Sequence, residues 1–144
     1  MFVRLFFTIL IFLVQFGVAQ NFTATVDNTT VGVNERFQLN FTFEGKDINS
    51  LKNFNPPSFN NFKVLSGPNQ STSMQIINGV SSSSLTLSYI LLSNSLGTFS
   101  IGSASIQYDG KTYSTSPIKI TIVQGTAKPK EEKQSAPPAL GDIF

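Results

Sequence analysis

Hydrophobic and polar residues alternate with a period of two in the most regular parts of the chain. In RFQLNFTF, at residues 36–43, Phe37, Leu39, Phe41 and Phe43 share one face and polar residues occupy the other. The segment PIKITIV, at residues 117–123, repeats the pattern with isoleucine at 118, 120 and 122. Side chains alternate between the two faces of a β-strand, so both patterns predict strands with one face in a core. No window beyond the first 19 residues shows a helical repeat, and the sequence therefore predicts an all-β domain.

Turn signals divide the chain into short strands. Asn78-Gly79 and Asp109-Gly110 each separate two strand-like segments, and both pairs favour the two-residue type I′ turn of a β-hairpin. Further breaks are predicted at residues 28–30, 45–47, 55–58, 67–69 and 94–97. Seven to nine short strands over about 100 residues are typical of an immunoglobulin-like or fibronectin-like antiparallel β-sandwich. We expect this sandwich over residues 20–125.

The Asn78-Gly79 turn fixes the pairing of a long hairpin. A two-residue loop pairs Ile77 with Val80, so Met74 lies opposite Ser83 and Thr72 opposite Leu85. One face then carries the apolar side chains Met74, Ile76, Leu85, Leu87 and Tyr89. The reverse face carries Ser71, Ser73, Gln75, Ser82, Ser84, Thr86 and Ser88. This reverse face is either the solvated outside of the hairpin or a surface that binds a neighbouring protein, because strand addition needs a pairable backbone and few repelling charges.

The two ends of the chain differ from its centre. Residues 1–19 combine one cation, a short apolar run and a small-residue ending, which predicts a signal peptide and an exported protein. The apolar run is shorter than the roughly 20 residues that a membrane-spanning helix needs. Residues 126–140 are rich in proline, lysine and glutamate, which predicts a disordered linker. We expect the final four residues, 141–144, to begin a second β domain that is missing from this chain.

Composition excludes several chemistries. Basic residues are scattered, whereas nucleic-acid binding needs a clustered basic surface. The chain has no histidine and no cysteine, which removes the usual catalytic triads and the zinc sites built from imidazole or thiolate. The five carboxylates of the domain lie at or beside predicted turns: Asp27, Glu35, Glu44, Asp47 and Asp109. We therefore expect no enzyme, no cofactor and no metal site.

Two tyrosines flank the second predicted turn. Tyr108 and Tyr113 could form a cross-strand pair that stiffens the hairpin. Exposed tyrosines could also stack on sugar rings, which keeps a cell-surface adhesin or glycan-binding domain open as the alternative function.

The order of three long segments resembles one known family. FTATVDNTTVGVNERFQLNFTFEG, FNPPSFNNFKVLSGPNQSTSMQIINGVSSSSLTLSYILL and GTFSIGSASIQYDGKTYSTSPIKITIVQG are similar to the N-terminal module of BatD proteins, the aerotolerance or oxygen-tolerance family of Bacteroidetes and relatives. The resemblance implies tandem immunoglobulin-like domains at the cell envelope or periplasm, with a membrane anchor further along that this chain lacks. It also implies a non-catalytic role in a Bat envelope complex, alongside BatA-like or BatB-like partners that carry von Willebrand A-type domains.

Asp109 is the candidate contact for such a partner. Von Willebrand A domains often hold a divalent ion with an open position, and hard ions accept a carboxylate oxygen from whatever docks. Asp109 is predicted at an exposed turn with no other acid beside it. The other reason for its presence is that Asp-Gly forms a good type I′ turn. The candidate contact residues combine this turn and its flanking tyrosines with two serines of the reverse hairpin face: Tyr108, Asp109, Tyr113, Ser82 and Ser84.

Overall fold

The structure is a computed structural model that describes residues 20–125. The expected signal peptide (1–19), linker (126–140) and second-domain segment (141–144) lie outside the described residues. Within residues 20–125 no helix is long and apolar enough to cross a membrane.

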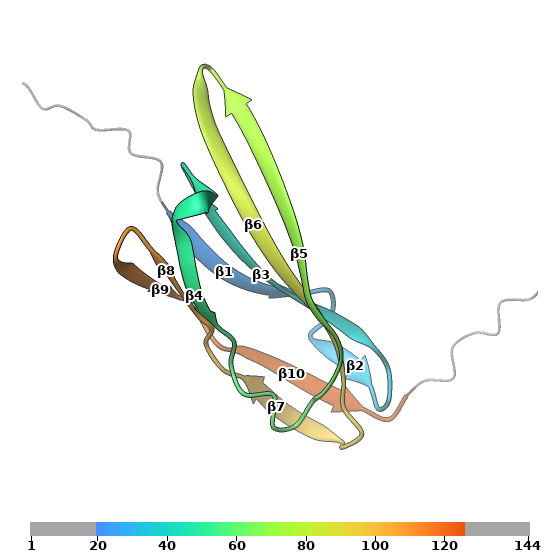
Figure 1. Ribbon diagram of the computed structural model, residues 1–144. Helices are drawn as coiled ribbons and strands as arrows, with labels where there is room; N and C mark the ends of the chain where they lie inside the picture. The colour runs from blue at the N-terminus through green and yellow to red at the C-terminus, as the bar shows by residue number, and fades with distance from the viewer. Residues whose placement is uncertain (1–19, 126–144) are drawn as a thin grey trace, which may run out of the picture.

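Two layers of strands enclose the core (Figure 1). The first layer is a four-stranded antiparallel sheet in the order β1 (Asn21–Val26), β3 (Phe37–Gly45), β6 (Val80–Leu92) and β5 (Lys63–Ile77). The second layer contains two three-stranded sheets. One has the order β2 (Thr30–Gly32), β10 (Ile118–Val123), β7 (Gly97–Ile101), and the other β4 (Leu51–Asn55), β8 (Ser105–Tyr108), β9 (Lys111–Ser114). A single 3-10 turn, η1 (Ile48–Ser50), precedes β4. The predicted all-β sandwich is confirmed.

The second layer is built around one long interrupted hairpin. β8 pairs with β9 and β7 pairs with β10 in the same register, so the two arms run continuously past a short gap. Pro117 lies in this gap and has no N–H to give to a ladder. Thr115 bridges the gap instead, because its N–H donates to the Ala104 carbonyl (2.9 Å) and its hydroxyl accepts from the Ala104 N–H (3.0 Å). This interruption is why the described chain has ten strands rather than the seven to nine predicted.

The core contains two sets of aromatic contacts, one around Phe41 and the other around Phe37. The four alternating residues of β3 are at most 2% exposed, as their pattern predicted. Phe41 lies 6.0 Å from Tyr89 and 5.7 Å from Phe54, measured between ring centroids. Phe37 contacts Phe62 at 5.6 Å. The second layer contributes buried Ile101, Ile106, Tyr108, Ile120 and Ile122. Packing alone stabilises this core, because the chain has no cysteine.

Strand β5 does not break at residues 67–69, where the sequence predicted a turn. The strand continues, and its register with β6 shifts between Ser66 and Asn69, which makes this position a bulge. Gly67 has φ = +121°, and a Cβ added there would lie 2.6 Å from the Ser88 carbonyl oxygen and 2.9 Å from a Tyr89 ring carbon. The residues at 67–69 do mark a backbone irregularity, but it is a bulge inside a long strand and not a turn between two strands.

We expect Gly67→Ala to destabilise the protein more than Gly79→Ala. Both glycines have positive φ, but a Cβ at Gly79 would contact nothing within 4 Å. Gly79→Ala should therefore cost only the ~1–2 kcal/mol of a left-handed alanine. Gly67→Ala adds a backbone clash, for which about 1–3 kcal/mol more is expected. Urea unfolding of both variants measures the difference, and equal losses would contradict the bulge geometry.

Ionisation of the Tyr89 hydroxyl should make the free energy of unfolding depend on pH in the alkaline range. Burial raises the pKa of its hydroxyl above the ordinary value, because the phenolate is poorly solvated in the core. Stability from this group is therefore complete below the unfolded pKa of about 10 and decreases as pH rises through the higher folded pKa. We expect the free energy of unfolding to fall more steeply above about pH 10 in the parent than in Tyr89→Phe. Parallel slopes in denaturant titrations across that range would contradict this.

Candidate functional site

The β5–β6 hairpin projects beyond the rest of the sandwich (Figure 1). β3 pairs with β6 only as far as Gly45 opposite Ser83. Beyond that point β5 and β6 continue as a two-stranded ribbon to the turn at Asn78 and Gly79, whose φ angles of 51° and 77° fit the predicted type I′ turn. The pairing predicted from the sequence, Ile77 with Val80 and Met74 with Ser83, is confirmed.

Four large apolar side chains are exposed at the end of this ribbon. The exposed fractions are 74% for Met74, 69% for Ile76, 57% for Ile77 and 55% for Val80. We call these four residues the apolar tip. Two lie on each face of the ribbon, because paired and alternate residues share a face.

The register confirms that the five predicted apolar residues share one face of the hairpin. Only part of that face is covered. Leu87 and Tyr89 are buried and Leu85 packs against the core, but Met74 and Ile76 are exposed. The ribbon extends past the end of the second layer, so no strand covers its distal part (Figure 1).

Some hydroxyl groups on the serine-rich reverse face already form hydrogen bonds with residues of β3. Thr42 and Thr86 share a hydrogen bond at 3.0 Å, and Ser88 donates to the Asn40 side-chain oxygen at 2.7 Å. Ser82 and Ser84 are half-buried and line a shallow hollow of about 220 Å³ where β3 ends, together with Glu44, Gly45, Ser73, Gln75 and Ser83. A docking protein would thus meet hydroxyls, one amide and a single carboxylate.

The β8–β9 hairpin holds the other candidate residues at the same end of the sandwich. Tyr108 is 5% exposed and its ring lies 5.0 Å from that of Phe43, while the half-buried Tyr113 lies 5.6 Å from Phe43. The two tyrosines contact each other at 6.4 Å and 69°, as an edge-on pair. Both rings therefore anchor the hairpin to the core. Buried Tyr108 has no free face on which a sugar ring could stack, so of the two tyrosines only the half-buried Tyr113 is left for the glycan alternative.

Asp109 lies at the turn that these tyrosines anchor. Its φ of +47° and that of Gly110, +75°, fit the predicted type I′ turn. Asp109 is exposed at the edge of a hollow of about 370 Å³, which Lys52 and Gln107 also line. Asn53 donates to the Gln107 side chain at 2.7 Å, which fastens β4 to β8 beside the hollow. Asp109 is therefore exposed at a turn that is anchored to the core, with Lys52 on the same hollow and Lys111 at the other side of the turn.

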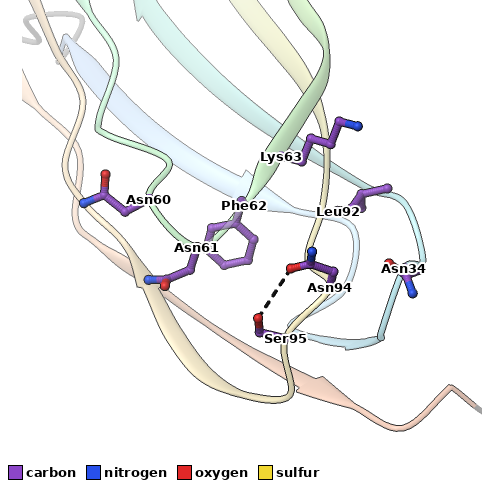
Figure 2. Close-up of a pocket in the computed structure, with 8 residues that line it drawn as sticks. All are labelled: Asn34, Asn60, Asn61, Phe62, Lys63, Leu92, Asn94 and Ser95. Carbon is purple, nitrogen blue, oxygen red and sulfur yellow. Dashed lines mark hydrogen bonds between the residues drawn. The ribbon is translucent and has the colours of Figure 1, made fainter.

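A larger hollow of about 470 Å³ lies at the opposite end of the sandwich (Figure 2). Its lining is mostly amide and hydroxyl: Asn34, Asn60, Asn61, Phe62, Lys63, Leu92, Asn94 and Ser95. Ser95 donates to the Asn94 side-chain oxygen at 3.4 Å, and the labelled side chains do not converge on one point. The lining contains no carboxylate, and its one hydroxyl, on Ser95, is hydrogen-bonded to an amide oxygen. The lining residues therefore do not indicate a catalytic site.

No three of the histidine, cysteine, aspartate and glutamate side chains gather into a metal-binding group within residues 20–125. All five carboxylates of the domain are exposed. A partner's metal ion could still reach a single donor such as Asp109.

The apolar tip is the feature that the sequence analysis missed as a candidate site. A signal for it was present, because Met74, Ile76, Ile77 and Val80 closely flank a turn, where polar residues are usual. A second signal was the run from Val64 to Tyr108, which contains no charged residue.

Comparison with known protein families identifies one match. The family model described as the BatD DUF11 like domain matches residues 24–122. This range spans nearly all of the described sandwich, from β1 to β10. A comparison with curated protein sequences found no match.

Proposed function

The chain belongs to the BatD family, and on that premise we propose that it is a non-catalytic protein-interaction module of the cell envelope. It would act outside the cytoplasm as part of a Bat complex linked to oxygen tolerance. The observation that carries this proposal is the projecting β5–β6 hairpin. Its exposed strand edge and apolar tip are surface properties suited to binding a protein.

The partner we propose is an envelope protein with a von Willebrand A-type domain. Such a domain would meet the end of the sandwich where the β5–β6 and β8–β9 turns both lie. Asp109 would supply a carboxylate oxygen to a divalent ion held by the partner. The geometry supports this role, because Tyr108 and Tyr113 fix the hairpin against Phe43 and leave Asp109 exposed at its turn.

We expect Asp109→Asn to weaken binding to a purified A-domain partner by about 10-fold to 100-fold, the usual worth of a charged contact. Asparagine tolerates the same positive φ, so the turn and the unfolding midpoint should not change. A chelator should weaken the parent to the same level and leave the variant unaffected. The measurement is titration calorimetry on the whole chain.

Glu35→Gln is the matched control, because it removes one negative charge away from both hairpin turns, and glutamine can still accept the hydrogen bond from the Gly32 N–H. If Asp109→Asn binds as tightly as the parent, with and without chelator, the ion bridge is refuted. Ser84→Arg then tests the serine-rich face. This position lies opposite Glu44 in the ladder, so the arginine has a partner and should be accepted by the fold.

A further inference from the structure

We propose that two copies of this chain pair through the free edge of strand β5, antiparallel and about a two-fold axis at Gln75. The paired segment is the distal part of the strand, residues 73–77. The result is a four-stranded ribbon in the order β6, β5, β5 and β6. This inference uses the strand edge and the apolar tip that also support the proposed function, but it requires only this chain, so it can fail without refuting the Asp109 contact.

The first support is an edge with unused backbone groups. β5 is the last strand of its sheet, and all 15 of its residues are exposed. In a two-residue hairpin the residues beside the turn form a hydrogen-bonded pair, and non-hydrogen-bonded pairs then alternate with hydrogen-bonded pairs along the ladder. Ile76 and Met74 belong to non-hydrogen-bonded pairs, so their N–H and C=O groups point away from β6 toward the free edge. A second strand would satisfy these groups.

The second support is self-complementarity. A two-fold axis at Gln75 places Met74 of each copy directly opposite Ile76 of the other. These two residues are the ones whose backbone groups face the edge, so the ladder and the side-chain pairing agree in one register. Met74 and Ile76 also share a face, and the four side chains from two copies would form one apolar cluster. This cluster would cover the two most exposed apolar residues of the described chain.

The third support is charge. An interface of this symmetry brings residues close to the two-fold axis near their own counterparts, so a charged residue there would meet a like charge. From Val64 to Tyr108 the chain contains no charged residue at all. The hairpin can therefore approach a second copy without electrostatic repulsion.

A protein strand fits this surface better than a lipid bilayer does. The apolar tip alone could enter a membrane interface, but the neighbouring edge groups of β5 would enter with it. Unpaired backbone groups are strongly disfavoured in hydrocarbon. A two-stranded ribbon is also only marginally stable by itself, and pairing with a second ribbon supplies the missing strands.

Disulfide trapping tests the register, because the chain has no native cysteine to interfere. At the two-fold axis the two Gln75 residues form an open antiparallel pair, whose Cα atoms are about 4.5 Å apart, within disulfide range. We expect Gln75→Cys to form a covalent dimer rapidly under mild oxidation. Ser71→Cys is the matched control, an exposed residue on the same face of the same strand. Its two copies would lie roughly 27 Å apart at ~3.4 Å per residue, so it should not crosslink.

Sedimentation velocity on the unmodified chain provides the second measurement. We expect a concentration-dependent monomer–dimer equilibrium that Met74→Lys and Ile76→Lys each abolish. Both side chains are exposed, so the unfolding midpoint should stay within the range of ordinary surface variants. A chain that remains monomeric at its highest soluble concentration would overturn the proposal. So would equal crosslinking of the two cysteine variants, or a monomer that binds phosphatidylcholine vesicles through Met74 and Ile76.

Discussion

The aromatic stripe of β3 is the feature on which the rest of the structure depends. Phe41 and Phe43 have no exposed surface, and the rings that surround them come from both layers. Phe41 contacts Tyr89 of β6 and Phe54 of β4, and Phe43 contacts both tyrosines of the β8–β9 hairpin. The contacts with Phe54, Tyr108 and Tyr113 join β3 to strands of the second layer, which no backbone ladder connects to it. A truncation in this stripe would therefore loosen the core and the Asp109 turn together.

The length of the stripe also decides where the hairpin loses support. β3 ends at Gly45, and past its partner Ser83 the β5–β6 ribbon has neither a third strand nor an opposite layer. The alternation of apolar residues continues past this point at Met74 and Ile76, so the strand pattern outlasts the core. The same side chains that would be ordinary core residues in a longer sandwich become an exposed apolar surface.

Patterns among residues that are close in the sequence predicted most of the fold. The alternation in β3 and the Asn-Gly and Asp-Gly turns predicted strands, turn type and register, because each depends on neighbours in the sequence. The sequence did not show where the opposite layer ends, so it did not predict that Met74 and Ile76 are exposed while Leu87 and Tyr89 on the same face are buried. Gly67 was interpreted as a break, because a bulge and a turn use the same residues. The inward rotation of Tyr108 likewise depends on Phe43, a residue 65 positions earlier in the numbering.

Only one half of β5 contains features that obstruct pairing of its exposed edge with another strand. The half nearest the loop contains Lys63, Pro68 and the bulge, and each of these features obstructs pairing with another strand. The half nearest the turn, from Asn69 to Ile77, contains no charge, no proline and no register shift. Proteins commonly protect the whole of a long edge because an open edge invites aggregation. Here protection stops at the bulge, before the ribbon leaves the sandwich at Met74, and this confines any added strand to a segment of nine residues or fewer, from Asn69 to Ile77. A short pairable segment bounded by a bulge on one side and a turn on the other favours one partner strand in one register over open-ended stacking.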